Sequence, residues 1–561
     1  MIEDADRLPG GTVLPADVCI VGAGPAGIAA ALALSGKGLS IVLLESGRRG
    51  PDAASQALGE GEVADVQLHS PPHRYRQRGL GGSTAIWGGR CMPFDPIDFE
   101  ARAHVPLSGW PIGYGDLLPY YPAANRLAEA GRFAYDARDA LPGSRPLIAG
   151  FSSDTVNTNG LERFSCPTDF GKRYERRLQV AGDIRVLLGA NCTAIRLQAD
   201  GRSVRELEVK TLAGNHLRVA PRATVLATGG LETARLLLCS NDVFAHGVGN
   251  AHDVVGRYYM CHIAGNVGTL TVPGAAAGVR HGYELSPDGV YCRRRLTIAA
   301  EAQRSRGLLN TVARLHFPRI TDPAHRSGVL SGLFLARRLI SYEYGKRLQS
   351  TAPLPPGTTA RHFLNVLRDP LDTTAFLAHW LRRRTLAHRK FPSVILRNRT
   401  NRFSLEVQAE QQPLAASRVM LTDRQDALGM RQLRVDWRYA RADIESVAGT
   451  LDLIASELER TGAGRFTYER ATLEEDLLHY GAYGGHHIGT ARMGTDPRTS
   501  VVNADCRLHA VNNLYVAGSA AFPTSGQANP TLTLIALALR VAAHLEQQLK
   551  TRPAVAVELA A

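Results

Sequence analysis

A histidine and an asparagine in the C-terminal quarter of the chain carry the functional groups that alcohol oxidation requires. His486 lies in "GGHHIGTARMG" and Asn529 in "SGQANPTLT", 43 residues further along, on either side of the strand-like "NNLYVAG". An imidazole accepts a proton efficiently near neutral pH, and a fixed amide hydrogen-bonds an oxygen on which negative charge develops. The pair could therefore take the hydroxyl proton of an alcohol and hold its oxygen, provided that the chain also supplies an acceptor for the hydride.

A strand, a glycine-rich turn, a helix and a second strand follow one another near the N-terminus. The apolar run at 17–22 leads into "GAGPAG", an Ala- and Leu-rich helical stretch and the strand at 40–45. Gly22 permits the tight turn, Gly24 lets the backbone approach a pyrophosphate, and Gly27 allows close packing of helix on strand. The N–H groups at the start of the helix suit the phosphates.

An acidic residue completes this pattern. Glu45 ends the second strand, 21 residues after Gly24, where a carboxylate binds a ribose hydroxyl. Alone, the glycine pattern also fits a tight strand–helix connection. With both strands, the helix and the acid in register it predicts a bound dinucleotide, and an acid at this place favours FAD or NAD over a cofactor with a 2′-phosphate.

Composition excludes several classes of protein. An apolar content of 44% is ordinary for a globular protein, and no run of about 20 apolar residues predicts a membrane span. The N-terminal segment lacks the basic and apolar pattern of a secretory signal. The 8 cysteines are scattered without a Cys-x-x-Cys pair, which argues against a disulfide framework and a zinc site. We therefore expect a cytoplasmic protein with no metal.

The net charge of +13 is confined to one segment. Residues 301–400 carry 18 Lys and Arg against 5 Asp and Glu, so the rest of the chain is neutral overall. No nucleic-acid-binding fold accompanies them, which argues against a nucleic-acid partner. The stretches 328–349 and 373–390 mix large apolar residues with basic ones and predict two helices. They would form a lid or oligomer contact, a peripheral membrane contact through 331–390, or an electropositive mouth for an acidic or lipid-linked sugar.

Three stretches of the sequence resemble the glucose-methanol-choline (GMC) oxidoreductase family. They are "GLGGSTAIWGG" at 79–89, "ATVLATGGLETARLLL" at 223–238, and the C-terminal block from "HHIGTARMG" to "NPTLTLIALALRVAAHL". The sequence is most similar to the sugar-oxidising branch, which includes pyranose oxidases and flavin-dependent glycoside dehydrogenases. The resemblance implies FAD as the cofactor and oxidation of an alcohol to a carbonyl.

The family motif His-x-x-Gly-Thr matches His486, which the resemblance makes the base, with Asn529 holding the substrate oxygen and the hydride passing to flavin N5. His487 remains the alternative base. Asn529 also fits the N-cap of the last helix, with Pro530 at the first helical position. That helix start would suit the flavin edge that becomes anionic on reduction.

The same resemblance implies the other cofactor contacts. The flavin, the phosphates and the adenine are expected to touch Ser46, Gly82, Ser83, Trp87, Cys192, Gly518, Pro530 and Thr531. In pyranose oxidases a histidine just before the loop tryptophan bonds covalently to the flavin, and that position is Ile86 here. The expected FAD is therefore held without a covalent bond.

The predicted fold is α/β, with a Rossmann-like FAD-binding domain and a substrate domain in which helices back an antiparallel sheet, as in GMC and p-hydroxybenzoate-hydroxylase-like proteins. The FAD-binding domain would be discontinuous, and the strand-like residues 401–440 would belong to the sheet over the flavin. The predicted boundaries are 12–100, 180–262 and 485–550 for the FAD-binding domain, and 101–179 and 263–484 for the substrate domain.

We therefore predict an FAD-dependent oxidoreductase, a dehydrogenase rather than an oxidase, that oxidises a CH–OH group of a sugar, glycoside or polyol. One alternative is a membrane-surface enzyme for a sterol or another apolar alcohol. Another is a non-catalytic electron-transfer flavoprotein, against which the intact pair His486 and Asn529 argues. The sequence leaves open whether oxygen, a quinone or a partner protein reoxidises the flavin.

Overall fold

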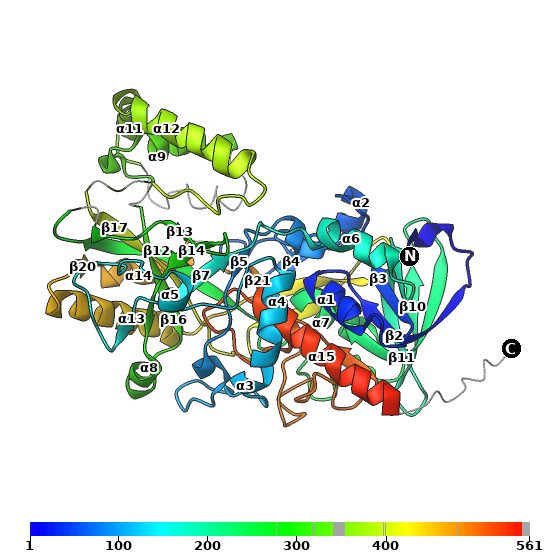
Figure 1. The fold of residues 1–561 in the computed structure, drawn as a ribbon. Coiled ribbons are helices and arrows are strands. Elements are labelled where there is room, and N and C mark those ends of the chain that lie inside the picture. Colours follow the sequence, from blue (N-terminus) through cyan, green and yellow to red (C-terminus); the bar gives the residue numbers. More distant parts are fainter. Residues whose placement is uncertain are drawn as a thin grey trace.

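The computed structural model describes residues 1–275, 278–317, 320–339, 354–396, 398, 400–479 and 481–551, and of residues 338, 483 and 484 only the backbone. Two large sheets lie side by side in the body of the molecule, and a small helical lobe lies beyond one of them (Figure 1).

One sheet has a parallel core. Its strands follow the order β1-β8-β3-β2-β11-β10-β9, and β22 also pairs with β11. The first five strands and β22 run parallel, and β10 and β9 extend the sheet antiparallel. The strands are β1 (Ile2–Asp4), β2 (Val13–Val21), β3 (Ile41–Glu45), β8 (Ile184–Leu188), β9 (Asn191–Leu197), β10 (Val204–Lys210), β11 (His216–Leu226) and β22 (Leu514–Val516).

Helices cover this sheet, and its central strands are therefore buried on both faces. α1 (Pro25–Leu34) packs against α15 (Thr531–Thr551), and α7 (Gly229–Cys239) follows β11. All five residues of β3 are buried, and so are most residues of α1. Continuous apolar strands and an all-apolar helix are what such double coverage requires. This is the α/β arrangement that the sequence predicts.

The second sheet is antiparallel. Its strand order is β20-β12-β17-β16-β15-β6, with β21 paired to β12. The strands are β6 (Val156–Asn157), β12 (Met260–Thr271), β15 (Leu296–Ile298), β16 (Thr311–His316), β17 (Arg402–Ala409), β20 (Arg465–Thr467) and β21 (Tyr483–Ile488). The amphipathic helix α13 (Arg441–Arg460) joins its core through Val447, Leu451 and Ile454. Gly462, just after this helix, has the left-handed φ of 63° that ends helices.

Only part of the strand-like stretch 401–440 joins this sheet, which corrects the prediction. β17 does, but β18 (Arg418–Gln425) and β19 (Arg431–Asp436) form a separate sheet with β4 (Gly61–Val63). Alternation of apolar and polar residues predicts strands but not their partners. Here the partner of β19 comes from a segment some 370 residues away, which local sequence does not specify.

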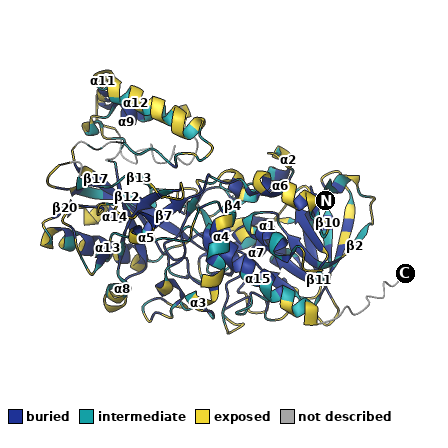
Figure 2. Ribbon diagram, viewed as in Figure 1, coloured by how far each residue is buried: buried dark blue, intermediate teal, exposed yellow. Residues whose placement is uncertain are grey.

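The lobe consists of α9 (Gly328–Leu335), a short turn at Arg337–Leu339, α11 (Thr358–Arg368), α12 (Pro370–Trp380) and the π-helical turn η8 (Leu381–Thr385). The first predicted helix, 328–349, is shorter than expected over the described residues, because α9 ends at Leu335; residues 340–353 lie outside them. The second begins at Pro370 rather than 373, and α11 was not predicted. Figure 2 shows many exposed residues on α11 and α12.

Strands of the first sheet, β1 excepted, come from the three ranges predicted for the FAD-binding domain. β4, within the first of these ranges, pairs instead with β19. The division of the chain into two domains remains a prediction.

Candidate active site

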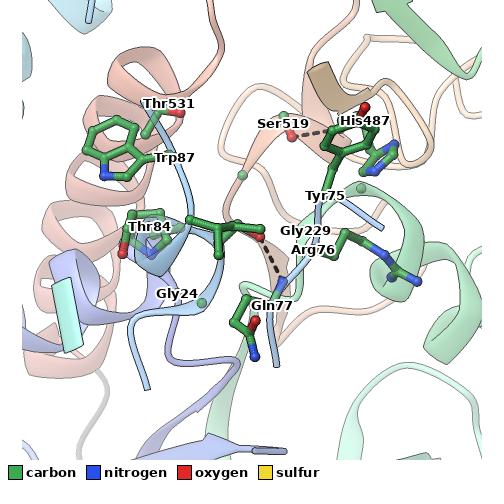
Figure 3. A pocket seen from close by; sticks show the side chains of 18 of the residues that line it. Gly24, Tyr75, Arg76, Gln77, Thr84, Trp87, Gly229, His487, Ser519 and Thr531 are labelled. Atoms are coloured by element: carbon green, nitrogen blue, oxygen red, sulfur yellow. Dashed lines mark hydrogen bonds between the residues drawn. The ribbon is translucent and has the colours of Figure 1, made fainter. Parts of the chain in front are cut away.

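A cavity of about 590 Å³ is lined by residues of both sheets and of the lobe, a size typical of ligand sites. In Figure 3, Trp87 and Thr531 lie on one side of it, and Tyr75, Arg76 and His487 on the other. We refer to the part formed by the glycine turn, β3 and α7 as the dinucleotide end, and to the part around His486 as the alcohol end.

The three glycines of the N-terminal turn have different surroundings. Gly22 has a φ of 101°, and a Cβ there would lie 2.7 Å from the carbonyl oxygen of Ala227. A Cβ at Gly27 would collide with the carbonyl oxygen of Gly22, while one at Gly24 would meet no atom within 4 Å. Gly22 and Gly24 line the cavity and Gly27 does not. A turn whose middle glycine leaves space beside a helix N-terminus fits a dinucleotide pyrophosphate.

The Glu45 carboxylate is hydrogen-bonded to backbone N–H groups of its own chain, which the sequence pattern did not predict. Its side chain is buried, and its oxygens accept hydrogen bonds from the backbone N–H groups of Ala23, Gly47 and Gly79, each at 2.9 Å. Burial raises the pKa of this carboxyl. Glu45 therefore ties the glycine turn to the loop at 79, and since it also lines the cavity, its contact with a ribose hydroxyl remains a prediction.

The loop 79–89 closes over this turn. Gly81 donates a backbone hydrogen bond to the carbonyl of Ala23 at 2.8 Å, and the Trp87 indole donates to the carbonyl of Thr168 at 3.0 Å. Ile86, where a covalent histidine would stand, lines the cavity and is 54% exposed. The other predicted cofactor residues that line the cavity are Ser46, Gly82, Ser83, Cys192, Gly518, Pro530 and Thr531.

The predicted N-cap role of Asn529 is wrong. The last helix begins at Thr531, one residue later than predicted, and the first turn closes with Leu534 N–H donating to the carbonyl of Pro530. The Asn529 amide contacts His486 instead, with its Nδ2 3.1 Å from Nε2 of that ring. The two residues first picked out in the sequence are thus brought together at the alcohol end.

Two further side chains fix this pair, and sequence reasoning missed both. Nδ1 of His262, on β12, lies 2.8 Å from Nδ1 of His486. Gln408, on β17, donates from its amide to the Asn529 side-chain oxygen at 3.3 Å and to the Gln527 carbonyl at 2.7 Å. His262 precedes His486 by 224 residues, and no motif links them.

The hydrogen bonds determine which imidazole nitrogen is free to act as a base. Burial, with His262 and Arg90 nearby, holds the pKa of His486 well below its ordinary value. Burial also lowers the pKa of His262 to about 4. Two neutral rings in contact through their Nδ1 atoms require one to donate and the other to accept. The Asn529 amide donates toward Nε2 of His486, so this nitrogen is the unprotonated one and its Nδ1–H points to His262.

His487 occupies a different network. Its Nδ1 lies 2.6 Å from the Tyr259 hydroxyl, which also contacts Nε2 of His69 at 2.8 Å and Sγ of Cys261 at 3.2 Å. The ligand-type atoms of His69, Cys261 and His487 lie within 4.8 Å of one another, but the tyrosine hydroxyl is hydrogen-bonded to each of them. We therefore read this cluster as a hydrogen-bonded polar core, in which only Nε2 of His487 lacks a partner among the described residues. The expectation of no metal site stays a prediction.

Comparison with known proteins identifies the family to which the chain belongs. The model of the FAD dependent oxidoreductases matches residues 17–311, more than half of the chain, and that of the GMC oxidoreductases matches 413–538. The chain belongs to the GMC family of FAD-dependent oxidoreductases. It is an FAD-dependent alcohol oxidoreductase, which confirms the predicted family, cofactor and reaction class.

Two relatives match this GMC oxidoreductase along nearly its whole length. A 2-methyl-1,2-propanediol dehydrogenase from Mycolicibacterium austroafricanum is 25% identical over 95% of both chains. A 6'''-hydroxyparomomycin C oxidase from Streptomyces lividus is 27% identical over 94% of this chain and 92% of its own. The crystal structure of pyridoxine 4-oxidase from Mesorbium loti covers 96% of this chain and 100% of its own, with a TM-score of 0.55 and 18% identity. That structural likeness concerns the fold alone, and it confirms the predicted fold class.

Proposed function

We propose that this enzyme oxidises a secondary or primary alcohol of a sugar, glycoside or polyol, with His486 as the base and Asn529 as the holder of the substrate oxygen. The observation that carries the proposal is the chain of contacts from Gln408 through Asn529 to His486 and on to His262 at the alcohol end of the cavity. Each member fixes the orientation of the next.

Each of these residues has a separate role in the proposed reaction. His486 accepts the hydroxyl proton at Nε2, and His262 keeps the opposite nitrogen protonated. The Asn529 amide, held by Gln408, donates to the oxygen as its O–H bond breaks, because a fixed donor stabilises the developing negative charge. FAD, held by the residues at the dinucleotide end, would supply the acceptor for the hydride. With Ile86 at the position of the covalent histidine, FAD is held by contacts alone.

The substrate class follows from the relatives and from the alcohol end. The two relatives act on a diol and on hydroxyparomomycin C, as their names state, and both names denote alcohols with several polar groups. The alcohol end offers polar and aromatic side chains: Trp87, Arg90, Phe164, Tyr283, Arg293, His316 and Glu406. Such a lining suits a polyhydroxylated molecule better than a sterol.

Anaerobic reduction of the flavin tests this function. Purified holoenzyme is mixed under argon with sugars, methyl glycosides, polyols, 1-alkanols and a sterol, and flavin absorbance is followed. We expect bleaching by one or more polyhydroxylated substrates and little by the apolar alcohols. Bleaching by the sterol alone would overturn the substrate class, and bleaching by none of the alcohols would favour the electron-transfer flavoprotein. Admission of air then separates oxidase from dehydrogenase, of which we propose the latter.

The surface of the lobe bears on two further parts of the proposal, the electron acceptor and the cellular location of the enzyme. The lobe and the residues that flank its helices carry ten of the large apolar side chains that are exposed in the described part of the chain: Leu335, Leu339, Leu354, Phe363, Leu364, Leu367, Leu371, Leu377, Leu381 and Leu386. The buried face of the lobe mixes apolar and polar groups: Leu330 and Phe334 are buried there, and Ser331 contacts His362 and Asn365. No helix among the described residues is long and apolar enough to cross a membrane.

Exposed leucines beside arginines fit the surface of an anionic bilayer. We propose that the enzyme is cytoplasmic, makes peripheral contact with the membrane through the lobe, and delivers its electrons to a quinone. Vesicles with and without anionic lipid test this in a co-sedimentation assay. The triple substitution Leu364→Ser, Leu367→Ser, Leu371→Ser should abolish binding, and the same change at Leu118, Leu212 and Leu285, exposed elsewhere, should not. Failure of the intact enzyme to bind anionic vesicles removes the membrane contact and leaves a lid or oligomer contact.

A further inference from the structure

The two ends of the cavity differ in charge. At the dinucleotide end three basic side chains face three acidic ones, in the pairs Arg76–Glu232 and Arg78–Glu232, both at 2.8 Å, and Arg235–Asp426 at 2.7 Å, with Glu45 as the third acid. At the alcohol end the charged lining residues are Arg90, Arg293, Arg384 and Glu406. The lining of the alcohol end thus contains three positively charged side chains and one negatively charged side chain.

In the described part of the chain, the ion pairs behind this lining contain more guanidinium groups than carboxylates. Arg293 pairs with Glu406 at 3.2 Å, Arg90 lies 3.6 Å from Glu162, and Glu162 also pairs with the buried Arg314. This network contains three guanidinium groups and two carboxylates, nearly all of them buried. Burial lowers the pKa of Arg314 to about 10, which reflects incomplete compensation. Among the described residues, three guanidinium groups share two carboxylates, so an additional anion would reduce the cost of burying this excess of positive charge.

One guanidinium in this network has a buried donor without a hydrogen-bond partner in the described part of the chain. The side chain of Arg293 is 5% exposed, and its Nε has no hydrogen-bond partner among the described residues. Arg384 adds a second donor set from the lobe. It is held by two hydrogen bonds from its NH1 to the carbonyls of Phe391 and Pro392, at 2.8 and 2.9 Å, and it lines the cavity.

Aromatic rings stand beside these arginines. The Tyr283 ring lies 5.9 Å from the guanidinium carbon of Arg293 and packs edge-on against Phe164 at 5.1 Å. Both rings line the cavity. Aromatic side chains next to guanidinium groups suit a ring with apolar C–H faces and a carboxylate substituent, since carboxylates and guanidinium groups match in geometry.

We propose that the alcohol end binds a carboxylate, so that the substrate is an acidic sugar such as a uronic acid or its glycoside. This rests on the proposed function and names its substrate class. Arg384 binds the carboxylate, Arg293 contributes positive charge beside it, Glu406 limits the excess of positive charge, and the alcohol to be oxidised lies at His486.

Equilibrium binding tests the proposal without turnover. Isothermal titration calorimetry is performed on the flavin-loaded His486→Ala variant with methyl β-D-glucuronide and methyl β-D-glucoside, which differ only at the carboxylate position. We expect the glucuronide to bind about tenfold more tightly at low ionic strength, an advantage that shrinks with added salt. Equal affinity for the two glycosides would overturn the carboxylate site.

Variants at the alcohol end should change this preference in opposite directions. Arg384→Gln is expected to weaken glucuronide binding about five- to tenfold and to leave glucoside binding unchanged, while Glu406→Gln strengthens glucuronide binding. Arg383→Gln, an exposed neighbour outside the cavity lining, is the matched control and should change neither. If Arg384→Gln and Glu406→Gln alter both glycosides equally, the charge serves the reacting oxygen and the proposal fails.

Failure of the carboxylate site and failure of the proposed oxidation give different results in these experiments. Tight binding of the glucuronide without flavin reduction in the unsubstituted enzyme supports the site and removes the proposed oxidation. Flavin reduction by neutral glycosides, with no preference for the acid, supports the oxidation and removes the site.

Discussion

The dinucleotide end and the alcohol end of the cavity are built in different ways. The first depends on backbone: a turn that only glycines permit, N–H groups at a helix start, and Glu45 tying two loops together. The second depends on side chains, with His262, Gln408, His486 and Asn529 meeting from four separate segments. A site made from backbone has a contiguous motif, whereas a site made from side chains exists only after the chain has folded.

The largest effect is expected at the alcohol end. His486→Ala should slow flavin reduction by about 10²–10⁴-fold, because the base is lost, while the flavin remains bound at the other end. Anaerobic stopped-flow absorbance measures both. His487→Ala is the comparison, since its ring contacts Tyr259 rather than Asn529. If His487→Ala loses reduction and His486→Ala does not, the base is assigned to the wrong residue.

Asn529→Ala should slow reduction by about 10²-fold, because one donor to the developing negative charge is removed. Leu534→Ala, in the first turn of the same helix and also at the cavity, is the control for a change at the helix start. Retention of the normal rate in Asn529→Ala would show that the amide holds no reacting oxygen.

A matched pair of glycine substitutions tests the dinucleotide end. Gly27→Ala forces a Cβ onto the carbonyl of Gly22 and should cost the protein about 1–3 kcal/mol of stability. A Cβ at Gly24 meets nothing, so Gly24→Ala should leave the melting temperature of the cofactor-free protein unchanged and weaken FAD retention instead. Thermal melts with and without FAD measure both. Equal melting temperatures for the two cofactor-free variants would contradict this division of roles.

A smaller effect is expected at His262. His262→Leu removes the acceptor for Nδ1–H of His486 and should slow flavin reduction about tenfold, since about one hydrogen bond is lost. His262→Gln keeps an acceptor and should recover much of the rate. Because His262 also helps to hold the pKa of His486 low, the acid limb of the rate profile should move to higher pH in the leucine variant. A profile that does not move would reduce His262 to a packing role.

The smallest effect is expected in the dependence of the flavin reduction rate on pH in the unsubstituted enzyme. The pKa of His486 lies below its ordinary value of 6.5, so Nε2 stays unprotonated as the pH falls from 8 to 6.5. Flavin reduction should therefore be flat over that range and decline only at lower pH. An acid limb centred at or above 6.5 would contradict a buried base.

Sequence patterns identified the dinucleotide end because its determinants are local. Gly22, Gly24, Gly27 and Glu45 lie within 24 residues and follow one strand–turn–helix–strand rule. The pair His486 and Asn529 was found through a spacing within one block of sequence. The cap assigned to Asn529 was wrong, because a cap and a substrate-facing amide have the same sequence signature, and only the position of His486 separates them.

His262, Arg293 and Arg384 carry no such signature. A histidine in a strand or an arginine beside an aromatic residue is usually structural, and what gives these residues a role is the meeting of β12, β14 (Tyr291–Arg294) and the lobe at one cavity. The same holds for β18 and β19, whose alternation predicted strands but not their pairing with β4.

Residue patterns alone predict the α/β fold and a bound dinucleotide, because glycine geometry, helix starts and buried strands are local consequences of residue type. FAD and the reaction class were implied by the resemblance to the GMC family. Only the tertiary structure decided which imidazole nitrogen is unprotonated and how charge is distributed between the two ends of the cavity. Those properties depend on distances between groups that are hundreds of residues apart, and on the burial that makes an unpaired charge or proton costly.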